Sequence, residues 1–244
     1  MIDTNAINEA ASAAEAAVLL YRGGFTPIKV CGKNPAFGEG KGWQSRTYES
    51  EEAVRKHFAG WNGEQEISEP IVENGKTISK KVCRNRNVGV LGDGYCLFGA
   101  NTKKAVDAFR AVMPFYDETL ARMGNNPFEC AIFKRSDPQE PFWTGQKIMT
   151  DEESPTTLAD IWGDHTQFVA WGIHPSGVRY KFTNDKSPVP LSTSALKRIL
   201  SEVMEVLGKG HRLKIQEKKT DLLEEHPKRH DNLFELVKKK VRIK

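Results

Sequence analysis

The sequence predicts an α+β fold, with a mixed, mainly antiparallel sheet flanked by helices. Short apolar segments typical of strands alternate with segments of helical periodicity, yet their order does not repeat as a regular β-α-β unit. The chain has 244 residues, 39% of them hydrophobic, which is enough for one large domain or for a domain with an appendage. No apolar run approaches the roughly 20 residues that span a bilayer, and the amino-terminal residues lack the pattern of a secretory signal.

The helices are indicated by apolar periodicity and by capping residues. Residues 5–22 are rich in alanine, with apolar side chains at helical spacing, and Gly23-Gly24 ends the segment. Ser192 is a typical N-cap for a helix that reaches about Leu207. Helices are therefore expected at residues 5–22, 49–58, 102–113 and 192–207.

The strands are indicated by short apolar runs between turn residues. Pro27, near the start of the first run, favours a sheet edge because proline has no amide proton to donate. Residues 62–79 are polar and contain Asn74-Gly75, which indicates a hairpin or an exposed loop. Strands are expected at residues 25–30, 88–91, 95–100, 130–134, 158–162, 168–171 and 179–182.

The distribution of charge divides the chain into two expected parts, 1–208 and 209–244. The second part holds 12 Lys or Arg against 6 Asp or Glu, whereas the first holds 24 against 26. Gly208-Lys209-Gly210 is the expected hinge between them. The basic part is either a solvated linker and the start of a helical accessory domain, or a segment that contacts nucleic-acid phosphates.

The four cysteines show no C-x-x-C pair and no histidine at zinc-site spacing, so no structural zinc site is expected. Cys96 and Cys130 lie in apolar runs and are expected to be buried as small hydrophobic residues. Cysteine usage without a secretory signal favours a reducing, cytoplasmic compartment.

The most informative segment is 87–101, which predicts a strand, a tight turn and a second strand. Five further segments complete the pattern: residues 21–28, 33–35, 42–44, 160–163 and 167–177. In their order and spacing, these six segments resemble the primase-polymerase domain of phage and plasmid replication proteins, within the archaeo-eukaryotic primase superfamily. The resemblance covers roughly residues 10–207, and residues 229–234 resemble the start of the accessory domain of longer relatives.

The resemblance implies template-directed nucleotidyl transfer, in which two Mg²⁺ or Mn²⁺ ions assist the attack of a 3′-oxygen on a nucleoside triphosphate. The family places two aspartates two residues apart on one strand, where their side chains share a face. Gly99 and Asn101 stand at these positions. Gly99 offers no ligand, Asn101 offers a neutral oxygen, and Asp160 matches a third acid, so metal binding is expected to be weak.

Three explanations of the missing acid pair remain open at this point. The domain is naturally degenerate and only binds nucleotide or DNA, or the chain is a disabled form, or another acid, such as Asp93 or Asp107, replaces the pair. Asp93 is more readily explained as shaping its Gly-Asp-Gly turn, and Asp107 as a residue on a helix surface.

The expected nucleotide-binding residues also follow from the resemblance. His174 would donate a hydrogen bond to the phosphates, or else ties its loop to backbone carbonyls. Lys134 or Arg135, at the end of a strand, would face the triphosphate unless both are solvated. Arg179 and Lys33 are further candidates for phosphate contact, although Lys33 does not belong to a P-loop pattern.

The sequence thus predicts the DNA primase-polymerase domain of a mobile-element replication protein, a nucleotidyltransferase with impaired metal catalysis. The expected partners are template and primer DNA, nucleotides and a fused or associated helicase, with no membrane. The alternative is a non-catalytic nucleotide- or DNA-binding module. The tryptophans are scattered and mostly expected in the core, with Trp43 and Trp143 in polar segments where stacking on a base is conceivable.

Overall fold

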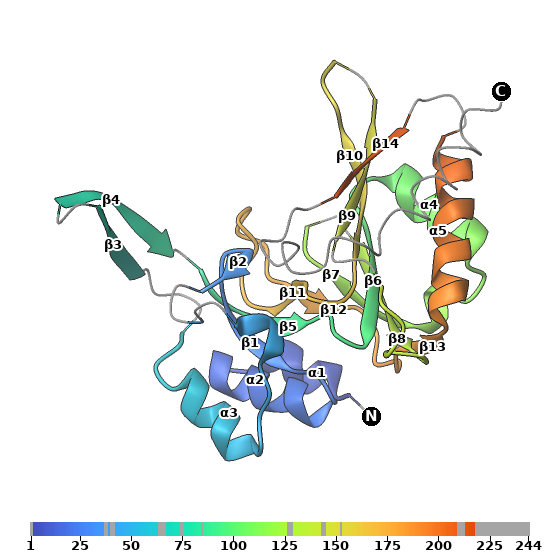
Figure 1. Cartoon of the computed structure of the whole chain (residues 1–244). Helices are drawn as coiled ribbons and strands as arrows, with labels where there is room; N and C mark the ends of the chain where they lie inside the picture. Colours follow the sequence, from blue (N-terminus) through green and yellow to red (C-terminus); the bar gives the residue numbers. More distant parts are fainter. Residues whose placement is uncertain are drawn as a thin grey trace.

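The computed structural model describes residues 2–36, 39, 42–62, 67–73, 76–83, 85–125, 129–142, 145–151, 153–208 and 213–217. It confirms the α+β class, with two mainly antiparallel sheets, a separate two-stranded hairpin and five α-helices in this part of the chain (Figure 1). The helices are α1 Thr4–Glu9, α2 Ala13–Arg22, α3 Glu51–Phe58, α4 Lys103–Val112 and α5 Thr193–Leu207. The strands are β1 Pro27–Cys31, β2 Asn34–Pro35, β3 Ile67–Glu73, β4 Lys76–Cys83, β5 Arg86–Leu91, β6 Tyr95–Ala100, β7 Leu120–Met123, β8 Glu129–Arg135, β9 Gln146–Thr150, β10 Thr157–Trp162, β11 Gln167–Trp171, β12 Lys181–Phe182, β13 Val189–Leu191 and β14 Leu213–Glu217.

The smaller sheet has the strand order β11-β5-β1-β2 and is antiparallel throughout. Helices α1, α2 and α3 lie beside it (Figure 1), and α2 contributes apolar side chains to the cluster that contains Val88 and Val90 of β5. Pro27 pairs with β5 on one side only, because β2 reaches no further than Val30. The strand β1 lies between β5 and β2, so the expected edge strand is wrong, although Pro27 itself has a paired neighbour on one side only.

The larger sheet has the order β12-β7-β8-β6-β10-β9-β14, with β13 paired in parallel to β8. One of its faces is covered by α4 and α5, whose apolar residues pack on Phe98, Phe133 and Ile161. Leu97 and Ile132 alternate with these residues and join the other cluster, with α2 and β11. The Gly-Asp-Gly turn after β5 does not close a hairpin, since β5 and β6 belong to different sheets.

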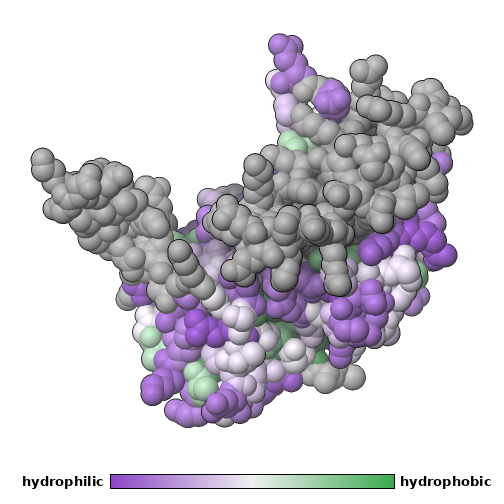
Figure 2. All heavy atoms as spheres, viewed as in Figure 1, coloured by the Kyte–Doolittle hydropathy of each residue, from purple (hydrophilic) through white to green (hydrophobic). Residues whose placement is uncertain are grey.

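The strands β3 and β4 form a two-stranded antiparallel hairpin that projects from the rest of the fold (Figure 1). The hairpin expected within residues 62–79 is thus confirmed, although β4 runs on to Cys83 and Asn74-Gly75 lie outside the described residues. In the view of Figure 2, the described surface is largely hydrophilic.

The helix expected over residues 5–22 is two helices in the structure. Ser12 caps the second one, with its Oγ accepting from the amide of Glu15 at 3.2 Å, while the Glu15 carboxylate accepts from the amide of Ala11 at 2.9 Å. The Ser12 contact is that of a capping box, whereas the Glu15 carboxylate accepts from the amide one residue before the cap. The alanine periodicity gave no sign of this break between the two helices. The Ser192 cap of α5 is confirmed.

Within the expected basic tail, the described residues Leu213–Glu217 form β14, which extends the larger sheet by pairing with β9. The other residues of that part, 209–212 and 218–244, lie outside the described residues. They include residues 229–234 and two of the three residues of the expected hinge. None of the described helices is long and apolar enough to cross a membrane.

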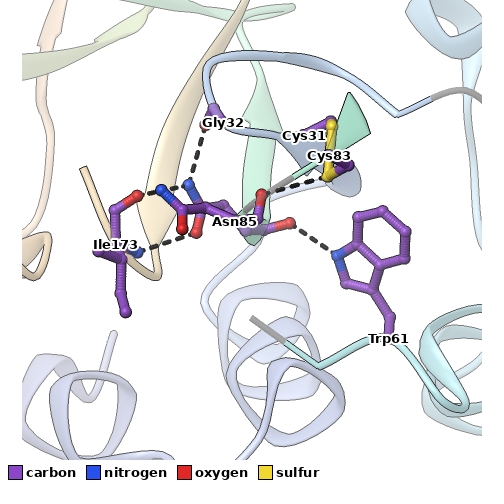
Figure 3. Close-up of a disulfide and its surroundings, with 7 residues drawn as sticks. Cys31, Gly32, Trp61, Cys83, Asn85 and Ile173 are labelled. Carbon is purple, nitrogen blue, oxygen red and sulfur yellow. Dashed lines mark hydrogen bonds between the residues drawn. A yellow bond between two sulfur atoms is a disulfide. The ribbon is translucent and has the colours of Figure 1, made fainter. Parts of the chain in front are cut away.

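A disulfide joins Cys31, at the end of β1, to Cys83, at the end of β4, with the two Cα atoms 5.2 Å apart (Figure 3). It fixes the base of the projecting hairpin to the turn between β1 and β2. The sequence analysis did not predict this bond, because 52 positions separate the two cysteines and because it expected a reducing compartment, where disulfides are rare. Cys96 and Cys130 are free and buried, as expected.

Replacing both Cys31 and Cys83 with serine is expected to lower the free energy of unfolding by about 4 kcal/mol, because the bond closes a loop of 52 positions and so restricts the unfolded chain. Denaturant unfolding of the variant and of wild type, each with and without a dithiol reductant, measures the effect. The reductant should destabilise wild type to the level of the variant and leave the variant unchanged. Equal stability of the variant and the oxidised wild type would contradict this prediction.

Candidate functional site

A cavity of about 610 Å³ lies where the larger sheet meets the β1–β2 turn and the loop that follows β11. Its lining contains five of the residues that the sequence analysis singled out. Gly99, Asn101 and Asp160 come from the larger sheet, while Lys33 and His174 come from the turn and the loop on the opposite side. Residues that are up to 141 positions apart in the sequence are thus brought to one site.

One row of side chains crosses the larger sheet at the floor of this cavity. Arg122 of β7 pairs with Cys130 of β8, Cys130 with Gly99 of β6, Gly99 with Asp160 of β10, and Asp160 with Lys147 of β9. Directly opposite residues of antiparallel strands point to the same face of a sheet. All five residues accordingly line the cavity.

Gly99 leaves space in this row that the indole of Trp162 occupies. A Cβ atom at position 99 would lie 2.5 Å from Cζ3 and 2.8 Å from Cη2 of Trp162, closer than side chains approach one another. Trp162 pairs with Leu97, two residues before Gly99, so its ring extends along the same face. A side chain at position 99 therefore requires the indole to move.

Asn101 and Asp160 are hydrogen-bonded to each other. The Nδ2 atom of Asn101 donates to Oδ2 of Asp160 at 2.6 Å. The backbone amide of Asn101 also donates to the carbonyl oxygen of Leu158, which holds the residue beside β10. Across the part of the chain that the structure describes, no group of three or more His, Cys, Asp or Glu side chains is arranged to hold a metal ion.

Arg122 is a buried cation without a carboxylate partner among the described residues. The residue is only 7% exposed, and its Nε has no hydrogen-bond partner. The guanidinium lies over the rings of Tyr180 and Phe168, 4.8 and 5.9 Å from the centroids. It also contacts the thiol of Cys130, but burial raises the pKa of that thiol to about 11, so the thiol is neutral near pH 7. Buried charges are normally paired, and this one is aimed at a cavity.

Lys33 and Lys147 add two more positive charges to the lining. Burial lowers the pKa of Lys33; Arg122 and Lys147 lower it further, whereas Asp160 raises it. The four charges therefore act on one another across the cavity. Asp160 and Glu129 are the carboxylates of the lining, and Glu129 lies 3.6 Å from Arg110.

Contacts within its own loop decide which ring nitrogen of neutral His174 carries the proton. The amide of Ser176 donates to Nδ1 at 3.1 Å, and the Ser176 hydroxyl lies 2.7 Å from the same atom. Since Nδ1 accepts, a neutral ring carries its proton on Nε2 and can donate it to a ligand. Burial lowers the pKa of His174, and the charges of Lys33 and Arg122 lower it further.

The buried side chain of Asn87 joins the turn that carries Lys33 to the loop that carries His174. Its Nδ2 donates to the carbonyls of Gly32 and Ile173, both at 2.9 Å, and its Oδ1 accepts from the amide of Ile173 at 2.8 Å. Gly172 has φ +119°, and a Cβ atom there would overlap the Asn87 amide, which explains the glycine.

The other predicted phosphate ligands are placed away from the cavity lining. Lys134 is exposed, four residues beyond Cys130 and so about 13 Å further along β8. Arg135 is buried; it donates to Asp164 at 2.5 Å and to the carbonyls of Asp137, Pro138 and Glu140. The guanidinium of Arg179 lies 5.5 Å from the ring centroid of Trp171.

The acids considered as replacements are also occupied elsewhere. Asp93 accepts from the amide of His165 at 2.7 Å, which ties its turn to the segment between β10 and β11, and Asp107 pairs with Lys103 on the surface of α4. Neither lines the cavity. Sequence reasoning missed Arg122 and Lys147. An arginine between apolar residues, as in Leu-Ala-Arg-Met of β7, is the signal that would have pointed to Arg122.

No protein-family model and no curated protein matches the chain. The geometry of this site is therefore the basis for a proposal about function.

The affinity of the cavity for an anion is expected to rise as the pH falls from about 8 to about 5.5. Burial and the charges of Lys33 and Arg122 lower the pKa of free His174, whereas a bound anion stabilises the imidazolium and raises that pKa, so binding takes up a proton between the two values. The gain is at most about tenfold for each unit by which the anion raises the pKa.

Calorimetric titration with sulfate, whose charge is constant over this range, measures this effect. His174→Asn should bind sulfate with no such pH dependence, and Ser176→Ala serves as the control that keeps the imidazole. A pH dependence of equal size in His174→Asn would show that another group is responsible.

Proposed function

We propose that this chain is a primase-polymerase-like domain that binds the phosphates of a nucleotide in the cavity but lacks two-metal catalysis, and acts as a nucleotide- or nucleic-acid-binding module of a replication complex. The observation that carries the proposal is the buried Arg122, which lines the cavity without a carboxylate partner among the described residues. A phosphate group would pair with this charge and form the planar, bidentate contacts that guanidinium favours.

The other cavity residues fit the same ligand. Lys33, Lys147 and the Nε2–H of His174 supply further donors, so a phosphate chain would meet donors from both sides of the cavity. Cations that converge on one concave site attract polyphosphates and raise their local concentration. Among the acids of the lining, Glu129 is close to Arg110, which leaves Asp160 as the carboxylate within the row.

The donor set does not fit a pair of divalent cations. Mg²⁺ requires several anionic oxygens in near-octahedral geometry. Here Gly99 has no side chain, the amide of Asn101 is hydrogen-bonded to Asp160, and Arg122 and Lys147 stand in the same row. The proposal therefore favours binding over catalysis, and primer extension with Mg²⁺ or Mn²⁺ by the wild-type chain would overturn it.

Replacing Arg122 with methionine is expected to weaken the binding of inorganic tripolyphosphate by about ten- to hundredfold, the loss that follows from removing a charge-assisted hydrogen bond. The free protein should be as stable as wild type or more stable, because the substitution removes a buried charge while it keeps the volume. Calorimetry and thermal unfolding measure the two effects.

Arg198→Met is the matched control, since it makes the same chemical change at an exposed arginine on α5 that does not line the cavity. It should leave tripolyphosphate affinity within about threefold of wild type, as expected for a surface charge. If Arg122→Met binds as tightly as wild type, or if wild type does not bind tripolyphosphate, the proposal is wrong.

Two aspartates at positions 99 and 101 are expected to restore metal binding only if the indole of Trp162 is also removed. Gly99→Asp with Asn101→Asp alone should give no DNA synthesis, because the new side chain collides with the indole of Trp162. The same pair combined with Trp162→Ala should gain Mg²⁺-dependent primer extension, since three carboxylates, at positions 99, 101 and 160, would then face the cavity. Primer extension on a labelled template measures the gain, with Trp162→Ala alone as the control. Failure of the triple variant to gain synthesis, while it still binds tripolyphosphate, would count against the alignment with primase-polymerases.

A further inference from the structure

Trp162 combines two features that set it apart from the other aromatic residues of the cavity. It lies in the wall between Arg122 and Lys147, and its benzo edge fills the space above Gly99. It is half-buried, with part of its ring packed on the core and part available to the cavity.

The other two aromatic residues of the lining, Phe168 and Tyr180, already have the guanidinium of Arg122 over their rings. Within the described residues, Trp162 makes neither a ring–ring contact nor a cation contact of this kind. Its indole is therefore the aromatic surface of this wall that a ligand can stack on.

We infer that Trp162 is the stacking surface for the nucleobase of the bound nucleotide, so that the cavity recognises a base together with its phosphate rather than phosphate alone. This inference rests on the proposed function. A basic groove that contains an aromatic platform is the arrangement by which proteins bind single nucleotides of a strand without sequence preference, because every base has a π-face. The base belongs to a free nucleotide or to a single strand, and the two share this chemistry.

The same contact gives a reason for Gly99. Any larger residue at position 99 would push the indole out of the row, so the glycine that removes a catalytic ligand is the residue that admits the platform. Loss of the metal ligand and gain of the stacking surface are thus one structural change. The cations on either side then hold the phosphate next to the stacked base.

The test compares three ligands on wild type and on Trp162→Leu by calorimetry: dATP, a short oligodeoxyadenylate and tripolyphosphate. Trp162→Leu should lose about five- to hundredfold in affinity for dATP, for the oligonucleotide or for both, and should bind tripolyphosphate as wild type does. Which of the two base-containing ligands is affected tells whether the stacked base is that of a free nucleotide or of a strand. Trp162→Phe should recover most of the loss, because phenylalanine keeps a π-face.

Trp43→Leu is the matched control, because Trp43 is also half-buried but does not line the cavity, and it should behave as wild type. Unchanged affinity of Trp162→Leu for both base-containing ligands would overturn the inference and leave the proposed function intact. Equal losses for tripolyphosphate and for dATP would also overturn it, because the indole would then only shape the cavity. Absence of all binding by wild type would overturn the proposed function and this inference together.

Discussion

The register of the larger sheet is the constraint on which the site depends. Side chains alternate between the two faces of a strand, so a slip of one residue in β6 would turn Gly99 toward the helices and Phe98 into the cavity. Phe98 packs with Phe109 of α4 and Phe133 of β8, whose rings lie 5.4 and 5.8 Å away, and these contacts oppose the slip. The apolar core on one face thereby decides which polar residues meet on the other.

The same register gives the cavity its charge. Arg122 and Lys147 lie at opposite ends of a row whose centre is Gly99, a position where a metal site would need a carboxylate. The guanidinium of Arg122 is withdrawn from water, and its contacts with Tyr180 and Phe168 compensate only part of the lost hydration. Such a buried, unpaired charge lowers the free energy of unfolding of the ligand-free protein. An anionic ligand that pairs with the charge offsets this cost.

Sequence periodicity and caps were sufficient for the elements with strong local signals. The helix that begins after Ser192, the strands around Gly92-Asp93-Gly94 and the α+β class all followed from patterns within a few residues. The break before α2 was missed because one serine and one glutamate decide it within an alanine-rich run. The short strands β7 and β9 were missed as well, and with them the two cations that they carry.

The part of the site that escaped prediction is the part that depends on pairing between distant strands. Gly99 was recognised as an unusual residue, but the indole above it is set by the pairing of Trp162 with Leu97, which no local pattern encodes. The resemblance identified Lys33, Asp160 and His174, which do meet in one cavity, whereas Arg135 is at the end of its strand and satisfied by Asp164 and by carbonyls.

Asn87 shows why the two loops of the cavity can act as a fixed pair. One buried amide uses both of its donors and its acceptor on the backbone of Gly32 and Ile173, the residues just before Lys33 and His174. The disulfide and the side chain of Gln167, which donates to the carbonyl of Lys33 at 2.7 Å, hold the same turn from other directions. Backbone contacts of this kind set the positions of the two cationic or proton-donating groups before a ligand arrives, so binding does not have to order the loops. A preorganised pair of donors facing a rigid sheet selects a ligand by the spacing of its charges, and this spacing is a property of the fold as a whole.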